Sequence, residues 1–514
     1  MSSWSHMSDA IAPGDELLGI DADEMLEFVR MLDPVVDLFD VNVGGWPEDS
    51  GTSRYYAEGH QLPWVSRVRE ATNKVIVGVG RFTNPDTMAS VIRTGALDLI
   101  GAARPAIADP FLPQKIREGR LDEIRECTGA NLCILRSETF RHVSCIQNPT
   151  AGEEYRRGWH PERFDPPADP SRAILVVGGG PAGMECAMVL GRRGYDAVHL
   201  VEAEPELGGK LRWTRRLPTL GDWGRVVDHR VIGLAKLDNV DVILGRRLSA
   251  ADVLDYGADT VIVATGSSWT GDGTQPYQAE RIEGADLALT PERVMAGERP
   301  AAVVGRAAEG DAGAGAQAGG SASRGRVVVY DTDGYYVGAG MAELLVLEGY
   351  EAHLVTSLPK VSPTSDESLE GDMLRRHLHG LGVVFHTEVV VHALDGADAE
   401  ADADAASPGE VATSGGSGVR RVRGETVYGE PWSLEADGVV LVTQQHSDNA
   451  LYHELVADPA ALDAAGIRQV LLIGDAAAPR LPSEAVFDGH RVARELEHAD
   501  PTAPRAWLRE RPPA

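Results

Sequence analysis

The sequence ILVVGGGPAGMECAMVLGRRGYDAVHLVE, residues 174–202, predicts a strand, a glycine-rich turn, a helix and a second strand. Its turn carries the pattern Gly-x-Gly-x-x-Gly at Gly178, Gly180 and Gly183. In such a turn the first glycine permits the sharp bend, the second lets the backbone approach a pyrophosphate, and the third lets helix and strand pack closely. The following strand ends in Glu202, whose carboxylate is expected to hold a ribose hydroxyl. The stretch therefore indicates a dinucleotide-binding α/β domain.

Three later segments extend the same nucleotide site. Gly208 and Gly209 form a second glycine pair that can face the diphosphate. The apolar strand VIVATG ends in Gly266, and the strand VLLIGDA ends near Asp475, a position suited to the sugar end of a dinucleotide. With these segments in order, a nucleotide site is favoured over a glycine turn that serves packing alone. Either ADP or FAD fits the pattern.

A second opening of this kind begins at RVVVYD, but its turn reads DTDGYY at residues 331–336. Two carboxylates and two tyrosines at that turn would repel and crowd a pyrophosphate. We therefore predict a smaller nucleotide-binding-like domain that has lost its nucleotide and does not exchange hydride with NAD(P)H. Two stretches rich in Ala, Gly and Asp, 306–325 and 395–418, read as low-complexity loops in or beside it.

The N-terminal segment alternates β-rich runs with stretches long enough for helices. VVDLFDVNV (35–43), KVIVGVG (74–80) and ALDLIG (96–101) are short apolar runs, and apolar side chains recur at helical spacing between Asp23 and Asp33. This pattern predicts parallel strands that are buried on both faces. The predicted domains are a β/α unit at 11–120, a cysteine-rich segment at 121–165, the doubly wound dinucleotide-binding domain at 170–290 and 440–514, and the degenerate domain at 291–439.

The amino-acid composition and net charge exclude several classes of protein. The chain has 514 residues, of which 43% are hydrophobic and 25% charged, so it is not disordered as a whole. Its 48 Lys and Arg against 78 Asp and Glu give a net charge of −30, which argues against nucleic acid or an anionic membrane as partner. No apolar run reaches the ~18 residues of a membrane span, and no leader pattern opens the sequence. We therefore expect a cytoplasmic protein.

Three of the four cysteines lie close together, as Cys127-x5-Cys133-x11-Cys145. So few cysteines in so long a chain do not indicate a disulfide framework, and thiolates this close in sequence can wrap an iron–sulfur cluster. Ala130 stands where the middle cysteine of a Cys-x2-Cys-x2-Cys run would be. Cys186 lies inside the predicted helix after the glycine turn and is expected to be a small buried side chain. Spacing alone leaves ordinary reduced cysteines open as an alternative to a cluster.

Distinctive sequences flank these cysteines: ARPAIADPFLPQKI at 103–116 and NPTAGEEYRRGWHPERF at 148–164. Together with the cysteine run they closely resemble the trimethylamine/dimethylamine dehydrogenase family, iron–sulfur flavoproteins akin to Old yellow enzyme and 2,4-dienoyl-CoA reductase. The resemblance extends from about Asp23 to His490 and is interrupted by the two low-complexity stretches.

The resemblance implies a (β/α)8 barrel that carries FMN and a [4Fe–4S] cluster, an ADP-binding domain, and a smaller degenerate nucleotide-like domain. It also implies that a small amine is oxidised at the FMN and that electrons pass through the cluster to an electron-transfer flavoprotein. The degenerate turn at 331–336 agrees with that route.

Individual residues match the family's cofactor positions. Cys127, Cys133 and Cys145 match cluster ligands, while Ala130 occupies the fourth ligand position. A [3Fe–4S] cluster, a [4Fe–4S] cluster with a non-cysteine ligand, and no cluster are all open. The pairs Gly80-Arg81 and Ala103-Arg104 match the turns after the last two barrel strands, where backbone N–H groups and an arginine would hold the FMN phosphate.

The substrate site matches only in part. Trp46 and Asp49 match a substrate-cage tryptophan and an active-site aspartate that orients a histidine; the alternative for Asp49 is a solvated loop acid. Ser137 stands where the family has a second cage tryptophan. A cation–π cage that lacks one wall would hold a small methylammonium less tightly.

The resemblance also implies that part of the barrel is missing, because only about three of eight strands are present. Three parallel strands cannot close, and they would expose edge N–H and C=O groups and an apolar barrel interior. We therefore expect a partial (β/α)8 barrel completed by a second polypeptide that supplies the N-terminal strands and shares the FMN site. A truncated or degenerate barrel is the alternative.

Three functions follow from these observations. The favoured one is a subunit of a heteromeric flavin-dependent amine dehydrogenase or N-demethylase that acts on a secondary or tertiary N-methyl amine. The second is a subunit of an enoate or 2,4-dienoyl-CoA reductase, which would need an NAD(P)H site. The third is a non-catalytic scaffold or electron-relay subunit that holds ADP structurally.

Overall fold

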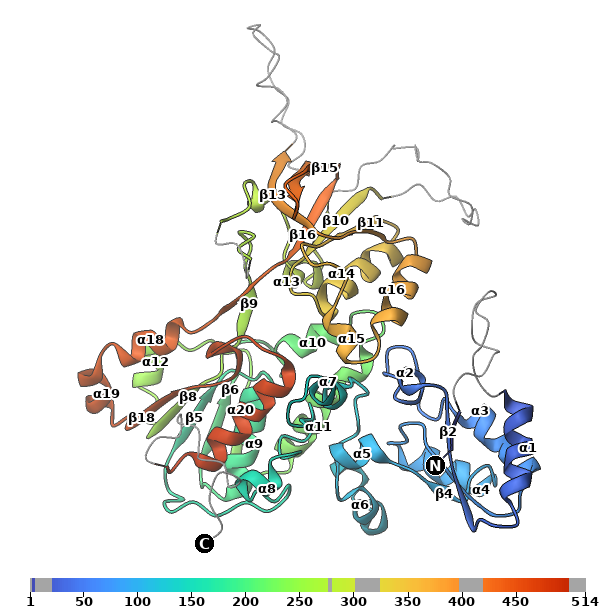
Figure 1. Ribbon diagram of the computed structural model, residues 1–514. Helices are drawn as coiled ribbons and strands as arrows, with labels where there is room; N and C mark the ends of the chain where they lie inside the picture. Colours follow the sequence, from blue (N-terminus) through green and yellow to red (C-terminus); the bar gives the residue numbers. More distant parts are fainter. Residues whose placement is uncertain (1, 5–20, 276–279, 301–323, 397–418, 499–514) are drawn as a thin grey trace, which may run out of the picture.

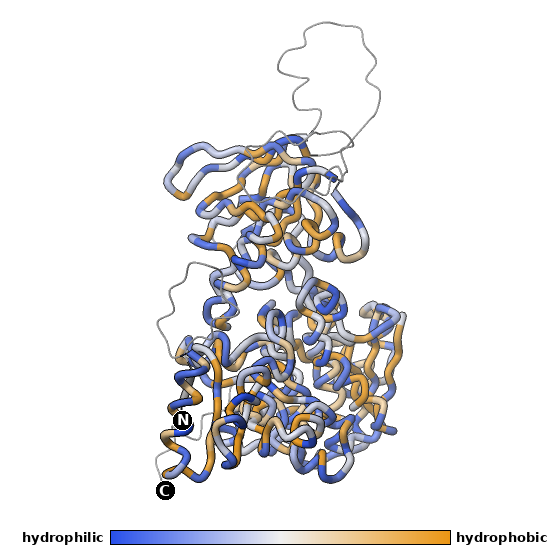
Figure 2. Tube along the Cα trace, turned by 90° about the vertical axis from the view of Figure 1, so that its right-hand side faces the viewer, coloured by the Kyte–Doolittle hydropathy of each residue, from blue (hydrophilic) through white to orange (hydrophobic). Residues whose placement is uncertain are grey.

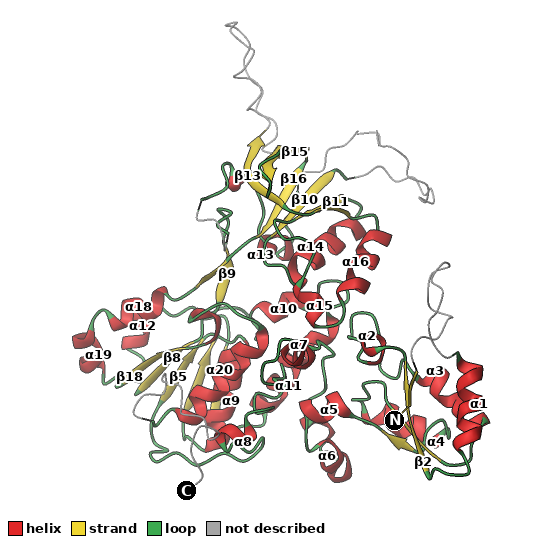
Figure 3. Ribbon diagram, viewed as in Figure 1, coloured by secondary structure: helices red, strands yellow, loops and turns green. Residues whose placement is uncertain are grey.

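The computed structural model describes residues 2–4, 21–275, 280–300, 324–396 and 419–498 (Figure 1). The strands belong to three α/β units, which lie at the three corners of a triangle in the view of Figure 3. Most of the two low-complexity stretches lies outside the described residues. No helix in the described part of the chain is both long and apolar enough to cross a membrane.

The N-terminal unit is an open sheet of four parallel strands in the order β1-β2-β3-β4. Its strands are β1 (Ser2–Trp4), β2 (Leu38–Val43), β3 (Val75–Gly78) and β4 (Leu99–Ile100). Its helices are α1 (Ala22–Leu32), α2 (Trp46–Asp49), α3 (Leu62–Val65), α4 (Pro85–Arg93), α5 (Ala103–Ala108) and α6 (Leu112–Glu118). The three predicted strands are present, and β1 is a fourth that the sequence did not indicate.

Only one face of this sheet is buried. Phe39, Val41 and Ile76 point toward the helices and are almost fully covered. On the opposite face, Leu38 and Val75 are paired neighbours and remain 43% and 39% exposed. Leu99 in β4 is 50% exposed. The expectation that these strands are buried on both faces is therefore wrong for the described residues, because nothing among them covers the second face.

The cysteine-rich segment connects this unit to the next through two short helices, α7 (Leu132–Glu138) and α8 (Glu154–Arg157). The second unit is a parallel sheet in the order β18-β8-β5-β6-β7, which is doubly wound as predicted. Its strands are β5 (Ile174–Val177), β6 (Val198–Val201), β7 (Val240–Ile243), β8 (Thr260–Val263) and β18 (Gln469–Leu472). Its helices are α9 (Pro181–Arg193), α10 (Lys210–Thr214), α11 (Arg225–Ala235), α12 (Ala250–Leu254), α18 (Ala450–Val456), α19 (Pro459–Ala465) and α20 (Pro482–Glu495).

The third unit lies above the other two in the side view (Figure 2). It combines a parallel sheet, β12-β11-β10-β16, with an antiparallel one, β13-β14-β15. Its strands are β10 (Arg326–Asp331), β11 (Glu351–Val355), β12 (Val384–His386), β13 (Val389–Gly396), β14 (Val419–Thr426), β15 (Pro431–Glu435) and β16 (Gly438–Val442). Its helices are α13 (Pro291–Met295), α14 (Tyr336–Leu347), α15 (Thr364–Glu367) and α16 (Gly371–Gly380). Because β16 pairs with β10, this unit runs past the predicted boundary at residue 439.

Two antiparallel strands, β9 (Ser267–Trp269) and β17 (Gln445–Ser447), carry the chain between the second and third units. The N-terminal unit is tied to the third by Asn131, whose Nδ2 donates to the carbonyls of Ser50 at 2.7 Å and Ser368 at 3.0 Å. Arg54 adds a buried ionic contact, with its guanidinium 3.6 Å from the Glu370 carboxylate. The cysteine loop therefore lies where the units meet.

Candidate functional site

A cavity of about 910 Å³ opens at the carboxyl ends of β5, β6 and β8. This is where open α/β sheets bind ligands, because helix N-termini and loop N–H groups converge there. The predicted residues Gly178, Gly180, Glu202, Gly209, Gly266 and Asp475 all line it. Two of the glycines are fixed by the fold itself. A Cβ on Gly178, at φ +110°, would lie 2.3 Å from the Ala264 carbonyl, and one on Gly183 would lie 1.9 Å from the Gly178 carbonyl.

Gly180 is different, because the fold does not require it to be glycine. A Cβ at this position would meet only the Cα of Gly209, at 3.9 Å, and would project beside the cavity. Gly180 precedes α9, which has no side-chain cap at its N-terminus. The space and the uncapped N–H groups fit the pyrophosphate of a dinucleotide. Gly208 supports the turn from outside the cavity lining, since its N–H donates to the Gly179 carbonyl at 2.8 Å.

Charged side chains at this cavity are held by short polar contacts. The Glu202 carboxylate accepts from the N–H groups of Gly179 at 2.6 Å and Glu204 at 2.8 Å, so it is fixed at the end of β6. Lys210 lies 3.3 Å from the Asp475 carboxylate and also contacts Ser267 and Gln445. Burial lowers the pKa of Lys210, and Asp475 acts against that shift. The sequence reading missed Lys210, although it directly follows the second glycine pair.

The corresponding turn of the third unit is filled by protein. A Cβ on Gly338 in α14 would lie 2.4 Å from the Asp331 carboxyl, so that side chain occupies the space below the helix. Its Oδ1 accepts from the Gly334 N–H at 3.0 Å, while its Oδ2 is buried without a partner. Burial raises the pKa of Asp331 to about 8 and that of Asp333 to about 6. This geometry supports the prediction that no pyrophosphate binds here.

The raised pKa of Asp331 predicts how the stability of the folded protein depends on pH. Its pKa near 8 in the fold exceeds that of an unfolded aspartate, about 3.9. The folded state therefore keeps a proton that the unfolded chain releases, and its stability falls as pH rises from about 4 to about 8. We expect Asp331→Asn to stabilise the protein by about 1–3 kcal/mol at pH 8 and by little at pH 5. Thermal melts of both proteins at the two pH values measure this; an equal shift at both would contradict it.

The two predicted phosphate turns of the N-terminal unit lie together beside the cysteine loop. Gly80 has φ +149°, and a Cβ there would lie 2.9 Å from the Cα of Gly59. The Arg81 guanidinium donates to the Tyr56 carbonyl at 2.7 Å, yet its Nε and Nη1 are buried without hydrogen-bond partners. Burial lowers the pKa of Arg81, and the nearby Arg104 adds to that shift. The Nη1 lies 3.6 Å from the Asp222 carboxylate, an ion pair beyond hydrogen-bond distance, so Nε and Nη1 keep N–H groups that fit an anionic ligand such as a phosphate.

Ala103 and Arg104 begin α5, whose N-cap position has no side-chain hydrogen bond. Arg104 does more than the sequence predicted. Its Nη1 donates to the carbonyls of Ser50 at 2.8 Å and Gly51 at 2.9 Å, and to Asn131 Oδ1 at 2.6 Å. The Arg104 guanidinium therefore links the loop after α2 to the cysteine-rich segment.

The three predicted cluster cysteines come together. Burial raises the pKa of Cys133 to about 12 and that of Cys145 to about 11, and the thiols of this group add to each other's shifts. Backbone N–H groups of Gly129 and Gln147 point at Cys127 Sγ and Cys145 Sγ, each at 3.4 Å. Three grouped thiols with N–H···S contacts are suitable donors for an iron–sulfur cluster.

The fourth position and the fourth cysteine are both apolar in character. Ala130 is 5% exposed and offers no donor atom, while Cys186 is fully buried in the core of α9, as expected. Within the described residues, no three His, Cys, Asp or Glu side chains are arranged around a single metal ion.

The predicted substrate residues lie on α2. Asp49 accepts a hydrogen bond from Gln61 Nε2 at 2.9 Å, and Gln61 in turn accepts from the Val43 N–H at 3.0 Å. Gln61 is 1% exposed, so it holds the Asp49 carboxylate in a fixed orientation, which a solvated loop acid would lack. Trp46 is 54% exposed and Ser137 on α7 is also exposed. Sequence reasoning missed Gln61, because its role depends on a loop that returns to the end of β2.

Comparison with known proteins agrees with this arrangement. Residues 19–123 match the NADH:flavin oxidoreductase / NADH oxidase family, and residues 176–243 match the NAD(P)-binding Rossmann-like domain. The chain is 40% identical over 498 residues to dimethylamine dehydrogenase of Hyphomicrobium sp. (strain x), covering 94% of this chain and 64% of that protein.

Two solved structures show the same architecture. Histamine dehydrogenase from Rhizobium sp. 4-9 superposes with a TM-score of 0.85 at 39% identity, over 97% of this chain and 66% of that one. The 6-hydroxypseudooxynicotine amine oxidase from Pseudomonas geniculata N1 gives a TM-score of 0.80 at 39% identity, over 93% and 64%. The chain thus spans just under two thirds of the length of these relatives. Over that span, it belongs to the trimethylamine/dimethylamine dehydrogenase family of flavin oxidoreductases.

Proposed function

We propose that this chain forms the cofactor-binding and electron-relay part of a flavin-dependent amine dehydrogenase or N-demethylase. The substrate is a secondary or tertiary N-methyl amine, and the electrons leave through an iron–sulfur cluster to an electron-transfer flavoprotein. The carrying observation is that the phosphate turns and the cysteine loop contact one another directly. Cys127 N–H donates to Thr83 Oγ1 at 3.0 Å, and Arg104 donates to Asn131.

This contact places the two cofactor positions within a short distance of each other. Cys127 lies close enough to Arg81 to act against the lowering of the guanidinium pKa by burial, and the Cβ position of Gly129 lies 3.1 Å from Arg81 Cζ. The turn that would hold an FMN phosphate is therefore packed on the loop that would hold a cluster. A flavin bound there supplies the two-electron acceptor that amine oxidation needs.

The chain's own residues have distinct tasks in this proposal. Arg81, Arg104 and the N–H groups at the start of α5 hold the flavin phosphate, while Cys127, Cys133 and Cys145 hold the cluster. Asp49, oriented by Gln61, helps position a catalytic histidine that the partner polypeptide supplies. The second-unit cavity holds ADP or FAD with its pyrophosphate at Gly180.

The uncovered sheet face supports completion of the barrel. Leu38, Val75 and Leu99 leave apolar surface on the side opposite the helices, next to the half-buried Val77. In a (β/α)8 barrel that side is filled by side chains from other strands. We propose that further parallel strands, carried by a second polypeptide, close over this face and supply the flavin-ring contacts.

The proposal is tested by anaerobic reduction of the completed protein. The chain is co-expressed with the N-terminal barrel segment of the Hyphomicrobium relative, and flavin absorbance is followed. We expect dimethylamine or another N-methyl amine to bleach the flavin at least tenfold faster than NADH, because the third-unit turn is filled by Asp331.

Other outcomes identify the competing functions. Faster bleaching by NADH than by the amine would favour the enoate reductase alternative. A complex that forms but retains no flavin would favour the scaffold alternative. The chain without the added strands is the control, and it is expected to bind little flavin.

A further inference from the structure

A second cavity, of about 410 Å³, lies between the segment after α6 and the outer faces of α9 and α11. It is at the opposite end of α9 from the nucleotide cavity, since Arg192 lies in the last turn of that helix and Gly180 precedes its first. The charged residues of its lining are five cations (Lys115, Arg120, Arg125, Arg192 and Lys236) and three carboxylates (Asp122, Glu123 and Glu162). A lining with excess positive charge is unusual in a chain of net charge −30.

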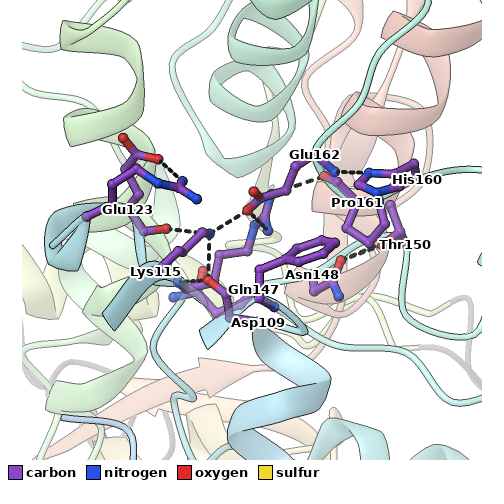
Figure 4. Close-up of polar contacts among 12 residues, drawn as sticks. Asp109, Lys115, Glu123, Gln147, Asn148, Thr150, His160, Pro161 and Glu162 are labelled. Carbon is purple, nitrogen blue, oxygen red and sulfur yellow. Dashed lines mark hydrogen bonds and ion pairs between the residues drawn. The ribbon is translucent and has the colours of Figure 1, made fainter. Parts of the chain in front are cut away.

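Most of these cations are already neutralised. Figure 4 shows the Lys115 ammonium between Asp109, Glu162 and the Glu123 carbonyl, at 2.7, 2.5 and 2.9 Å. All three of its N–H donors therefore have partners. Arg125 lies 3.4 Å from Glu162.

The two cations at the rim of the cavity are paired as well. Arg120 binds Glu118 and Glu123, both at 2.7 Å. Lys236 binds Asp122 at 2.7 Å and Glu123 at 3.3 Å. Neither side chain is available for a ligand without breaking an ion pair.

Arg192 and His229 are the exceptions. The Arg192 guanidinium has no ion pair or hydrogen bond within the described part of the chain, and its Nη2 lies 3.5 Å from the Cβ position of Gly233. His229 is one helical turn before Gly233 on α11, so both face the same way. Both ring nitrogens of His229 are buried without a hydrogen-bond partner, and the residue is 7% exposed.

This pair is costly for a protein to maintain without a ligand. His229 has two buried ring nitrogens without a partner, although buried polar groups are nearly always hydrogen-bonded. The part-buried Arg192 has Glu185, Glu162 and Glu123 in its surroundings but no ion pair among the described residues. Burial and the nearby Arg125, Arg230 and Arg192 hold the pKa of His229 well below its usual value. A group that brings negative charge and several acceptor oxygens would relieve both residues at once.

We propose that this cavity is a binding site for a phosphate group, with Arg192 as its ion-pair partner and His229 as a hydrogen-bond donor. The planar guanidinium suits two oxygens of a phosphate, and the volume leaves room for a small phosphorylated metabolite as well as the free anion. The site does not depend on flavin, cluster or amine, so it stands apart from the proposed function.

The test is calorimetric titration of the full chain with inorganic phosphate at constant ionic strength. We expect saturable binding that Arg192→Gln weakens at least tenfold, because the only unpaired cation of the lining is removed. His229→Phe is expected to weaken it as well, and it serves as the second variant if Arg192→Gln fails to fold by circular dichroism. Titration with glycerol 3-phosphate shows whether the source is a metabolite or free phosphate: tighter binding indicates the former, equal or weaker binding the latter.

Two controls separate this site from general charge effects. Arg468→Gln removes the same charge from a side chain that is 68% exposed, and it should leave phosphate affinity unchanged. Gly180→Val blocks the nucleotide cavity, which has its own anion-binding turn, and phosphate binding should persist in it. Equal affinity in Arg192→Gln and the parent, loss of binding in Gly180→Val alone, or no binding to the parent would each overturn the proposal.

Discussion

Gly180→Val is expected to lower the affinity for ADP or FAD by at least about 100-fold while the protein stays folded. The Cβ of this residue would meet only Gly209 at 3.9 Å, so the fold tolerates a side chain there. A valine would instead fill the space beside the N-terminus of α9 where a pyrophosphate must come close to the backbone. A 100-fold loss corresponds to about 2.7 kcal/mol of binding free energy. Calorimetric titration with each nucleotide measures it.

Gly183→Val provides the matched contrast from the same turn. Its Cβ would lie 1.9 Å from the Gly178 carbonyl, which is backbone and cannot move aside. We expect this variant to lose the folded second unit, with a cooperative transition missing from its thermal melt. Gly180→Val should melt within a few degrees of the parent. Unchanged nucleotide affinity in a folded Gly180→Val protein would show that the pyrophosphate does not bind at this turn.

The nucleotide cavity could be predicted in detail because its determinants are local in sequence. The turn at Gly178 follows directly from the strand before it, and Glu202 ends the strand after it. Lys210 was missed because its role depends on Ser267 and Asp475, which reach it from distant segments. Periodicity identifies an element and its buried face, but it does not show which side chains of remote elements meet.

The same limit applies to the N-terminal unit. The strands β2, β3 and β4 could be predicted from short apolar runs, whereas β1 is a three-residue strand in a polar stretch and gave no signal. The apolar runs alone predicted burial on both faces, because Leu38 and Val75 look like core residues in sequence; only the resemblance to a barrel family led us to expect an exposed apolar face. The lack of partners at Arg192 and His229 could not be predicted from the sequence either, because the balance of charges in a cavity depends on which distant segments meet in the folded chain.

The cysteine loop leads to the second large effect. Ala130→Cys is expected to raise the iron content from about three to about four per chain and to convert a [3Fe–4S] cluster into a [4Fe–4S] cluster. The residue lies between Cys127 and Cys133, in the buried part of the loop, and its replacement adds a thiolate where the loop lacks a donor. Iron analysis measures the ratio. Electron paramagnetic resonance of the oxidised protein measures the cluster type, because the oxidised three-iron form is paramagnetic and the usual oxidised four-iron form is not.

Two control variants distinguish a cluster bound by these cysteines from adventitious iron. Ala339→Cys places a thiol at a fully buried alanine of the third unit, and it should leave both iron content and spectrum unchanged. Cys133→Ala removes one of the three grouped thiols and should abolish bound iron, because two thiolates would leave the remaining irons of a cluster without a protein ligand. Four irons in the parent would mean that a non-cysteine ligand already completes the cluster. A parent and an Ala130→Cys variant that both lack iron after anaerobic reconstitution would make the three thiols structural, and the electron route proposed for this chain would fail with them.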